Sequence, residues 1–310
     1  MKINLSNIKK AKNLLNKSEC VAIPTETVYG IAGNAYSDSA CKKIFKLKKR
    51  PRNNPLIIHY YNLKKLKSDC DLNGDFIKLY KRFCPGPITF ILNQKKSSKI
   101  SKIATNKKST LAVRFPKHPV ARSLLKYLKF PIAAPSANIS SRVSAVTSSD
   151  VKDDFGKKIK YILEGGRSSV GVESTIIDLR KKPKILRLGG LEVEIIQKIL
   201  KKKISIKINP SNISAPGQFR IHYSPGIPIR LNAKEIKKDE ALLLIKKSKI
   251  NKPNYYFLSK KGNLKEATKN LYTILRKIKK DNYKSIAVGK IPNKGFGKTI
   301  NDRLMRASKF

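Results

Sequence analysis

A cluster of basic residues lies in a short loop that contains two prolines. Lys48, Arg50 and Arg52 alternate over five residues, and Pro51 and Pro55 restrict the backbone beside them. Alternate residues of an extended loop face the same side, so the three cations can converge on one anion. Arginine offers a planar bidentate fork and lysine a compact charge, a combination that suits a polyphosphate. In a chain so rich in lysine, a charge run that faces solvent is the alternative.

A second candidate group is the hydroxyl and carboxamide pair of Ser136 and Asn138. The apolar run 131–134 predicts a short strand, and Pro135 ends it because proline cannot donate to a sheet. Side chains two residues apart share a face, so the pair forms a compact donor and acceptor group at the strand tip. An ordinary turn is the alternative, since serine and asparagine are common in turns.

Several classes of site find no support in the sequence. There is no nucleophile elbow, no metal-ligand spacing and no pair of carboxylates, so we predict no protein-held metal. The stretch 295–299 imitates a phosphate loop, but Pro292 stands where the first glycine is needed. Glu26 and Glu173 lie in polar loops, where a carboxylate commonly binds backbone amides. The predicted site therefore works by positioning and charge neutralisation, without a covalent protein intermediate.

The elements that must position these loops alternate between strands and helices. Apolar runs predict strands over 20–24, 56–60, 88–92, 110–115, 131–134, 161–163, 174–179 and 185–188. Apolar residues at helical spacing predict helices over 6–17, 38–48, 74–83, 118–128 and 191–201. This alternation favours an α/β fold with binding groups on loops at strand ends.

The chain divides into two predicted domains and a connecting segment. Residues 1–203 form the larger α/β domain, and residues 204–226 carry turn signals without helical periodicity, which indicates a linker. The linker contains an Arg-Ile-His-Tyr sequence at 220–223, which is oddly specific for a spacer. Residues 227–310 predict a smaller α/β domain, with strands over 228–231, 241–245, 255–258 and 285–288 and helices over 264–280 and 298–308.

The overall charge of the chain favours anionic partners. The 310 residues include 69 Lys and Arg against 20 Asp and Glu, a formal net charge of +49. Such an excess suits nucleotides, RNA or a membrane surface. A biased genome is the alternative, because the lysines are dispersed over every segment.

Cysteine spacing and hydropathy limit where in the cell the protein is expected to be. The four cysteines are far apart and form no C-x-x-C pair, which argues against a zinc site or a disulfide framework. No run approaches the roughly 18 apolar residues that span a bilayer, and the N-terminus lacks an apolar signal core. We expect a protein that is not a membrane protein and is located in the cytoplasm.

Six polar motifs occur in order along the chain. They are PTETVYG at 24–30, the basic loop and strand at 48–59, PGPIT at 85–89, AVRFP at 112–116, APSAN at 134–138 and GVEST at 171–175. Together they resemble the YrdC-like L-threonylcarbamoyladenylate synthases, densely over 19–190. The linker resembles the long two-domain form, and the C-terminal unit resembles it more loosely, mainly at 300–304. The resemblance implies a YrdC-like twisted mixed sheet with flanking helices, plus a smaller Rossmann-like C-terminal domain.

The resemblance also implies a nucleotidyltransferase reaction. L-Threonine, bicarbonate or CO₂, and ATP give threonylcarbamoyl-AMP and pyrophosphate, with Mg²⁺ accompanying the ATP. A separate threonylcarbamoyl transferase then modifies an adenosine beside the anticodon of tRNA. Lys48 and Arg50 would neutralise the charge that develops on the phosphates, as catalytic residues.

The resemblance carries binding roles to individual residues. Those implied for ATP are Arg50, Asn54, Thr110, Ser136, Asn138, Ser144, Arg187 and Tyr223. Those implied for threonine are Thr27, His59, Arg114, Ala134 and Ser174, with Arg114 on the carboxylate. Because Tyr223 lies on the linker, the linker is expected to fold over the nucleotide as a lid that excludes water.

Some positions depart from the family pattern, and two other functions remain open. Lys49 stands where the family often has glycine, and the segments 140–141 and 167–169 also differ. The main alternative is a basic module that binds tRNA or double-stranded RNA without synthase activity. A YrdC-like domain in carbamoyl transfer for hydrogenase maturation is a further alternative, which the absence of zinc-finger cysteines argues against.

Overall fold

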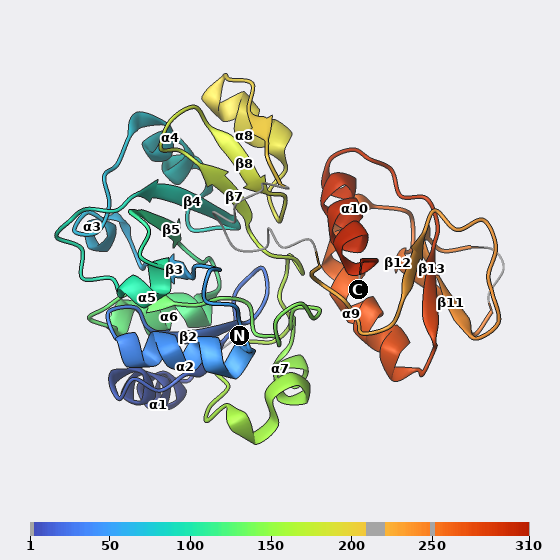
Figure 1. Cartoon of the computed structure of the whole chain (residues 1–310), viewed down its shortest axis with the longest axis horizontal. Coiled ribbons are helices and arrows are strands. Elements are labelled where there is room, and N and C mark those ends of the chain that lie inside the picture. Colours follow the sequence, from blue (N-terminus) through green and yellow to red (C-terminus); the bar gives the residue numbers. More distant parts are fainter. Residues whose placement is uncertain (1–2, 209–220, 249–251, 310) are drawn as a thin grey trace.

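The computed structural model describes residues 3–208, 221–248 and 252–309, which form two domains lying side by side (Figure 1). Most of the predicted linker, 209–220, lies outside the described residues, including its Arg220. No helix in the described ranges combines the length and the apolar sequence that a bilayer span requires.

The N-terminal domain is built on one mixed sheet of nine strands. In spatial order these are β1 (Val21–Ile23), β2 (Gly30–Asn34), β6 (Ile132–Ala133), β3 (Ile57–His59), β5 (Thr110–Arg114), β4 (Ile88–Asn93), β7 (Thr175–Asp178), β8 (Lys184–Arg187) and β9 (Ser205–Ile206). β3 runs parallel to β5 and β4 parallel to β7, whereas β4 pairs with β5 antiparallel. The mixed sheet confirms the predicted fold class. Because β9 pairs with β8, this sheet extends past residue 203.

Helices cover both faces of this sheet. They are α1 (Leu5–Asn16), α2 (Asp38–Lys48), α3 (Leu63–Leu66), α4 (Gly74–Phe83), α5 (Lys102–Thr105), α6 (Pro119–Tyr127), α7 (Ser148–Phe155), the short 3₁₀ helix η1 (Gly156–Lys158) and α8 (Val193–Leu200). One apolar cluster joins α1 and α6 to one face, and another joins α2, α4 and α8 to the other. The predicted strand at 161–163 makes only a single bridge, from Ile162 to Ala22.

The C-terminal domain is a parallel four-stranded sheet with two helices. The strand order is β10 (Ile229–Leu231), β13 (Ser285–Val288), β11 (Glu240–Lys246) and β12 (Tyr255–Ser259), and the helices are α9 (Leu264–Lys280) and α10 (Phe296–Ala307). These elements agree closely with those predicted. On α9, buried residues recur every three or four positions, which gives the helix one apolar face.

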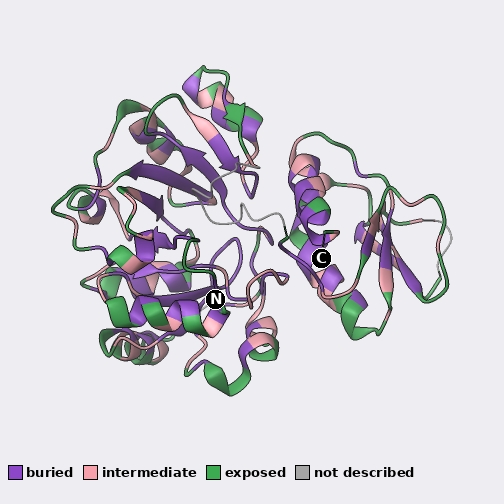
Figure 2. Cartoon of the chain, viewed as in Figure 1, coloured by how far each residue is buried: buried purple, intermediate pink, exposed green. Residues whose placement is uncertain are grey.

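The two domains share an apolar core across their interface. Figure 2 shows buried residues along both sheets and on the inner sides of the helices. Val28, Val143 and Val172 of the N-terminal domain belong to the same buried cluster as Leu271 and Leu275 of α9. The C-terminal domain is therefore packed directly behind loops that carry predicted site residues.

Candidate active site

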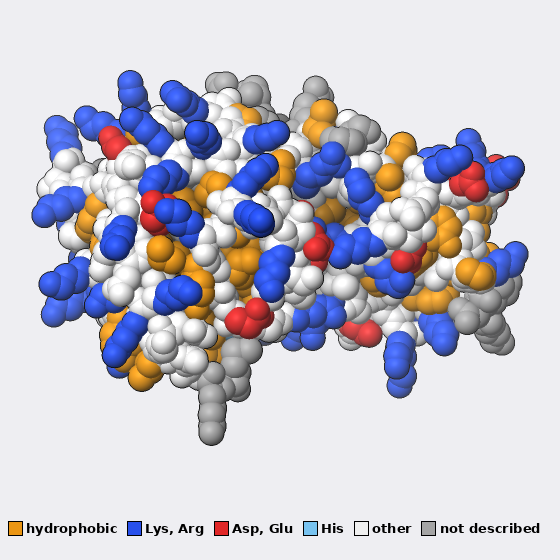
Figure 3. Space-filling view, turned by 90° about the horizontal axis from the view of Figure 1, so that it is seen from below, with side chains coloured by type: hydrophobic (Ala, Val, Ile, Leu, Met, Phe, Trp, Pro, Cys, Tyr) orange, Lys and Arg blue, Asp and Glu red, His pale blue; other side chains and the backbone are white. Residues whose placement is uncertain are grey.

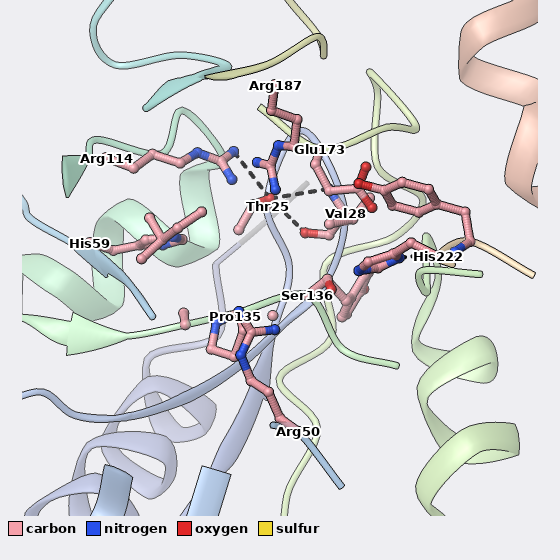
Figure 4. A pocket seen from close by; sticks show the side chains of 15 residues that line it. Thr25, Val28, Arg50, His59, Arg114, Pro135, Ser136, Glu173, Arg187 and His222 are labelled. Atoms are coloured by element: carbon pink, nitrogen blue, oxygen red, sulfur yellow. Dashed lines mark hydrogen bonds between the residues drawn. The ribbon is translucent and has the colours of Figure 1, made fainter. Parts of the chain in front are cut away.

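A cavity at the ends of the central strands gathers residues from most of the predicted polar motifs (Figure 4). Its lining consists of Thr25, Val28, Tyr29, Gly30, Arg50, Ile57, His59, Arg114, Ala134, Pro135, Ser136, Glu173, Arg187, His222 and Tyr223. Figure 4 shows Arg114 and Arg187 entering from one side and Arg50 from the opposite side. Such a convergence of cations and polar groups is typical of a binding site for an anionic ligand.

His59 and Arg114 lie side by side because β3 and β5 are parallel and in register at these residues. Both ring nitrogens of His59 are buried and have no hydrogen-bond partner among the described residues. Arg114 donates from Nη2 to Glu26 Oε1 over 2.8 Å, whereas its buried Nε has no partner there. Burial, together with the charge of Arg114, lowers the pKa of His59 well below 6.5. A neutral imidazole and a half-satisfied guanidinium therefore face one end of the cavity.

Lys48 and Arg50 are buried at the other end of the cavity. The Lys48 ammonium donates to the backbone carbonyls of Ser136 and Asn138, each over 2.5 Å. Arg50 donates to the carbonyl oxygen of Asn54 over 2.9 Å and to its side-chain oxygen over 2.6 Å. Burial, and then the charge of Arg50, lowers the pKa of Lys48. Since none of these partners is a carboxylate, an incoming polyanion would relieve the repulsion between the two cations.

The third cation of the basic loop does not join the other two. Arg52 is exposed, so the expectation that all three cations converge is wrong for this residue. The reason is that α2 continues to Lys48 and Lys49 then adopts the left-handed conformation, with φ 48°. The backbone therefore turns sharply at this point and is not an extended run with alternating sides.

Ser136 and Asn138 form the predicted pair. Ser136 Oγ donates to Asn138 Oδ1 over 2.6 Å, and the Asn138 amide donates to the carbonyls of Ile139 and Arg142, each over 2.8 Å. Asn138 thereby fixes the serine hydroxyl at the cavity wall. The two residues act as a unit in which Ser136 faces the cavity and Asn138 holds it.

Glu173 and Arg187 complete the wall beside the linker. Glu173 Oε1 accepts from Ser144 Oγ over 2.5 Å. Arg187 donates from Nη2 to the carbonyl and the hydroxyl of Ser174 over 2.9 and 3.0 Å, and Ser174 also shares a hydrogen bond with Thr89. Two loops far apart in sequence are thus held together by hydrogen bonds between charged and polar groups.

The structure brings the predicted site residues together in two tiers. Those that line the cavity are Arg50, His59, Arg114, Ala134, Ser136, Arg187 and Tyr223. Those one hydrogen bond behind a lining residue are Thr27, Lys48, Asn54, Asn138, Ser144 and Ser174. Thr110 is set apart: it begins β5, four residues and about 13 Å along the strand from Arg114.

Several lining residues received no role from the sequence, and Thr25, Glu173 and His222 are the ones with side chains most suited to polar contacts. Thr25 and Glu173 belong to two of the polar motifs, and a polar residue in a strand-end loop was the available signal. His222 precedes Tyr223 in the linker, and its ring lies 4.0 Å from the tyrosine ring, centre to centre. No spacing rule connects it to residues 50 or 187, because the contact depends on how the linker packs.

Family models match nearly the whole chain. The model of the Sua5, YciO and YrdC family, described as "Telomere recombination", matches residues 13–189. The model described as "Threonylcarbamoyl-AMP synthase, C-terminal domain" matches residues 191–309. The second match agrees with the two-domain form that the sequence motifs resemble.

Individual relatives agree in sequence and in structure. The threonylcarbamoyl-AMP synthase of Pyrococcus abyssi is 34% identical over 97% of this chain and 94% of its own length. That of Bacillus subtilis is 33% identical over 98% of this chain and 94% of its own. A crystal structure of P. abyssi Sua5 in complex with L-threonine superposes with a TM-score of 0.91, at 32% identity, over 100% of this chain and 96% of that one. The chain belongs to the threonylcarbamoyl-AMP synthase family, in its two-domain form.

Proposed function

We propose that this chain forms threonylcarbamoyl-AMP and pyrophosphate from L-threonine, bicarbonate or CO₂, and ATP. The observation that carries the proposal is that the two ends of one cavity present different chemical groups. One end presents the unpartnered nitrogens of His59 and Arg114, and the other presents the buried cations around Arg50. A zwitterionic amino acid and a polyphosphate are complementary to these two ends.

The threonine half of the reaction uses the end with Arg114. Its guanidinium binds the threonine carboxylate through a charge-assisted hydrogen bond, while neutral His59 contacts the bound amino acid. Ala134, Thr27 and Ser174 shape and support this end. The neutral threonine amine attacks CO₂, a C–N bond forms as one C–O π bond breaks, and the nitrogen releases a proton to solvent to give the carbamate. Holding the amino acid in place directs the carbamate oxygen toward the nucleotide.

The nucleotide half uses the cations. The carbamate oxygen attacks the α-phosphorus of ATP, and the bond between that phosphorus and the pyrophosphate oxygen breaks. Lys48 and Arg50 neutralise the charge that develops on the phosphoryl oxygens and the leaving pyrophosphate. The residues proposed to bind ATP are Arg50, Asn54, Thr110, Ser136, Asn138, Ser144, Arg187 and Tyr223, of which Arg50, Ser136, Arg187 and Tyr223 line the cavity.

Mg²⁺ is proposed to enter as part of the substrate, on the phosphates of ATP. No group of three or more potential metal ligands occurs in the described ranges. The carboxylate that lines the cavity, Glu173, already accepts from Ser144, and Glu26 behind the lining is engaged with Arg114. Magnesium usually keeps water and phosphate ligands and requires few protein ones, which fits this arrangement.

Tyr223 supports the proposal that the linker closes over the nucleotide as a lid. It is almost fully buried, its φ is 66°, and its hydroxyl has no partner in the described part of the chain. The cavity it closes is only about 30 Å³, room for roughly two water molecules. The site must therefore open for substrates to enter, and we propose that Tyr223, which lines the cavity, moves as it opens. We expect Tyr223→Ala to weaken ATP binding and slow pyrophosphate release, and unchanged values for both would contradict the lid.

The downstream partners follow from the chemistry of the product. A mixed anhydride hydrolyses readily, so a separate threonylcarbamoyl transferase is proposed to take it and modify tRNA beside the anticodon. On the face drawn in Figure 3, Lys and Arg are spread over both domains and are not gathered over one element. Direct tRNA binding to this surface would be nonspecific and strongly dependent on salt.

The deciding experiment measures pyrophosphate release from ATP and bicarbonate, with L-threonine, with L-serine and without amino acid. The wild-type chain should release pyrophosphate only with L-threonine. Lys48→Met and Arg50→Lys should each reduce that release at least about tenfold, since each weakens neutralisation of the transition state. Lys42→Met, an exposed residue of α2, is the matched control and should keep full activity.

The opposite outcome would favour the RNA-binding alternative. If pyrophosphate release does not depend on threonine, the synthase proposal fails for this chain. Titration of tRNA at several salt concentrations would then decide whether the chain is a basic RNA-binding module.

A further inference from the structure

Arg303 of the C-terminal domain reaches the wall of the active site, although it lies 130 residues from its partner there. Its side chain is fully buried. Nε donates to Glu173 Oε2 and to the Tyr272 hydroxyl, both over 3.1 Å, and Nη2 donates to the Leu188 carbonyl over 2.7 Å. Nη1 pairs with Asp302 over 2.6 Å. An arginine held by four groups from four segments has a fixed position.

The same guanidinium lies against the linker tyrosine. The Arg303 guanidinium carbon is 4.4 Å from the centre of the Tyr223 ring, a cation–π contact. Tyr272 stacks on Tyr223 with ring centres 6.0 Å apart and planes 19° apart. Tyr223 has a positive φ, which is unfavourable for a residue other than glycine, so contacts of this kind are needed to hold it.

Glu173 connects Arg303 to the cavity. One of its oxygens accepts from Tyr272 and Arg303, and the other accepts from Ser144. Although burial raises the pKa of Glu173, the charges of Arg303 and Arg187, with the Ser144 hydrogen bond, lower it to about 2. The carboxylate is therefore ionised and oriented at both oxygens. Without Arg303, a buried negative charge would lose its main compensation.

We propose that Arg303 is a positioning residue for the nucleotide half of the site, acting through Glu173 and Tyr223. Through Glu173 it orients Ser144, and through the ring contact it holds Tyr223 in the closed position. Its hydrogen bonds and its ring contact reach neither His59 nor Arg114, so threonine binding by these two residues should not depend on it. The inference rests on the proposed function and assigns the C-terminal domain a part in forming the nucleotide site.

The test uses Arg303→Lys in the full-length chain, because lysine keeps the charge but loses the planar fork. We expect the dissociation constant of ATP, measured by titration calorimetry, to rise about 10- to 100-fold, as for one lost charge-assisted hydrogen bond. The dissociation constant of L-threonine should stay within about twofold of wild type. An unchanged ATP constant, or an equal loss for both ligands, would overturn the proposal.

Two further variants separate positioning from general destabilisation. Tyr272→Phe keeps the ring but removes one hydrogen bond to Glu173, so it should show a smaller shift in the same direction. Arg167→Lys is the matched control, because Arg167 also bonds across the interface, to Asn270, but at an exposed site away from the cavity. It should leave both constants unchanged.

A double-mutant cycle tests whether Arg303 acts through Glu173. If it does, Arg303→Lys combined with Glu173→Gln should weaken ATP binding by less than the sum of the two single losses, because only the route through Tyr223 remains independent. Additive losses would overturn the route through Glu173. These readouts are binding constants, so they do not depend on turnover. A wild-type chain without threonine-dependent pyrophosphate release would refute the synthase proposal and not this one.

Discussion

The Arg114 side chain is oriented by a carboxylate and still keeps hydrogen-bond donors for a ligand. Its Nη2 donates to Glu26 and, over 3.4 Å, to Thr25, while its buried Nε has no partner in the described chain. Glu26 in turn accepts from the backbone amide of Lys117 over 2.9 Å. The carboxylate orients the guanidinium and leaves donors for a ligand.

We expect Arg114→Gln to raise the KM for L-threonine about 10- to 100-fold, because a charge-assisted hydrogen bond to its carboxylate is lost. The dissociation constant of ATP should stay close to that of wild type. Arg122→Gln is the control, since Arg122 donates to the Tyr61 carbonyl outside the cavity. Steady-state kinetics with varied threonine gives the answer, and a KM within twofold of wild type would exclude this role.

At the scale of elements, the end of α2 decides where the cations go. Lys49 is the C-cap of the helix in the left-handed conformation, and Lys48 and Arg50 on either side of it are buried. This conformation costs a residue other than glycine about 1–2 kcal/mol. It also explains in physical terms the glycine that the family often has at this position.

Lys49→Gly should therefore raise the free energy of unfolding by about 0.5–1 kcal/mol, since relief of strain exceeds the added entropy of the unfolded chain. Lys42→Gly, within the same helix, should lower it by about 1 kcal/mol. Urea denaturation followed by circular dichroism measures both. If Lys49→Gly destabilises as much as Lys42→Gly, the turn does not carry this strain.

At the scale of the whole molecule, two buried neutral histidines in the site make the free energy of unfolding depend on pH. Burial is the main cause that lowers the pKa of His222 to about 3, although Glu173 opposes it. Burial likewise lowers the pKa of His59 well below 6.5. The unfolded chain binds protons near pH 6.5 that the folded chain does not bind. Stability is therefore fully present above pH 6.5 and is lost as the pH falls toward 3.

Between pH 7.5 and pH 5.0, each of these histidines should lower the free energy of unfolding by up to about 2 kcal/mol. This range lies above the titration of most carboxylates, so it isolates the histidine contribution. Urea denaturation at both pH values should show a smaller difference for His222→Asn than for wild type. An identical difference in the two proteins would mean that His222 titrates normally.

Local patterns in the sequence were enough to predict the fold class, the order of most elements and the identity of the polar loops. Amphipathic spacing fixed α9, and short apolar runs fixed strands such as β4 and β13, because these signals depend on neighbouring residues. Ser136 and Asn138 form the predicted pair, but across a bend and not on an extended tip, since the Asn138 backbone amide donates to the Ser136 carbonyl over 3.1 Å.

The positions of these groups relative to one another depend on long-range packing. The αL turn at Lys49 sends Arg52 to solvent, and Lys48 is held by carbonyls of a loop about ninety residues away. Arg303 meets Glu173 across 130 residues, through an interface of packed helices and loops. Such contacts depend on the packing of distant elements, and sequence spacing constrains only neighbours along one helix or strand. The residue types needed for the chemistry are therefore visible in short sequence motifs, whereas their relative positions come from long-range packing.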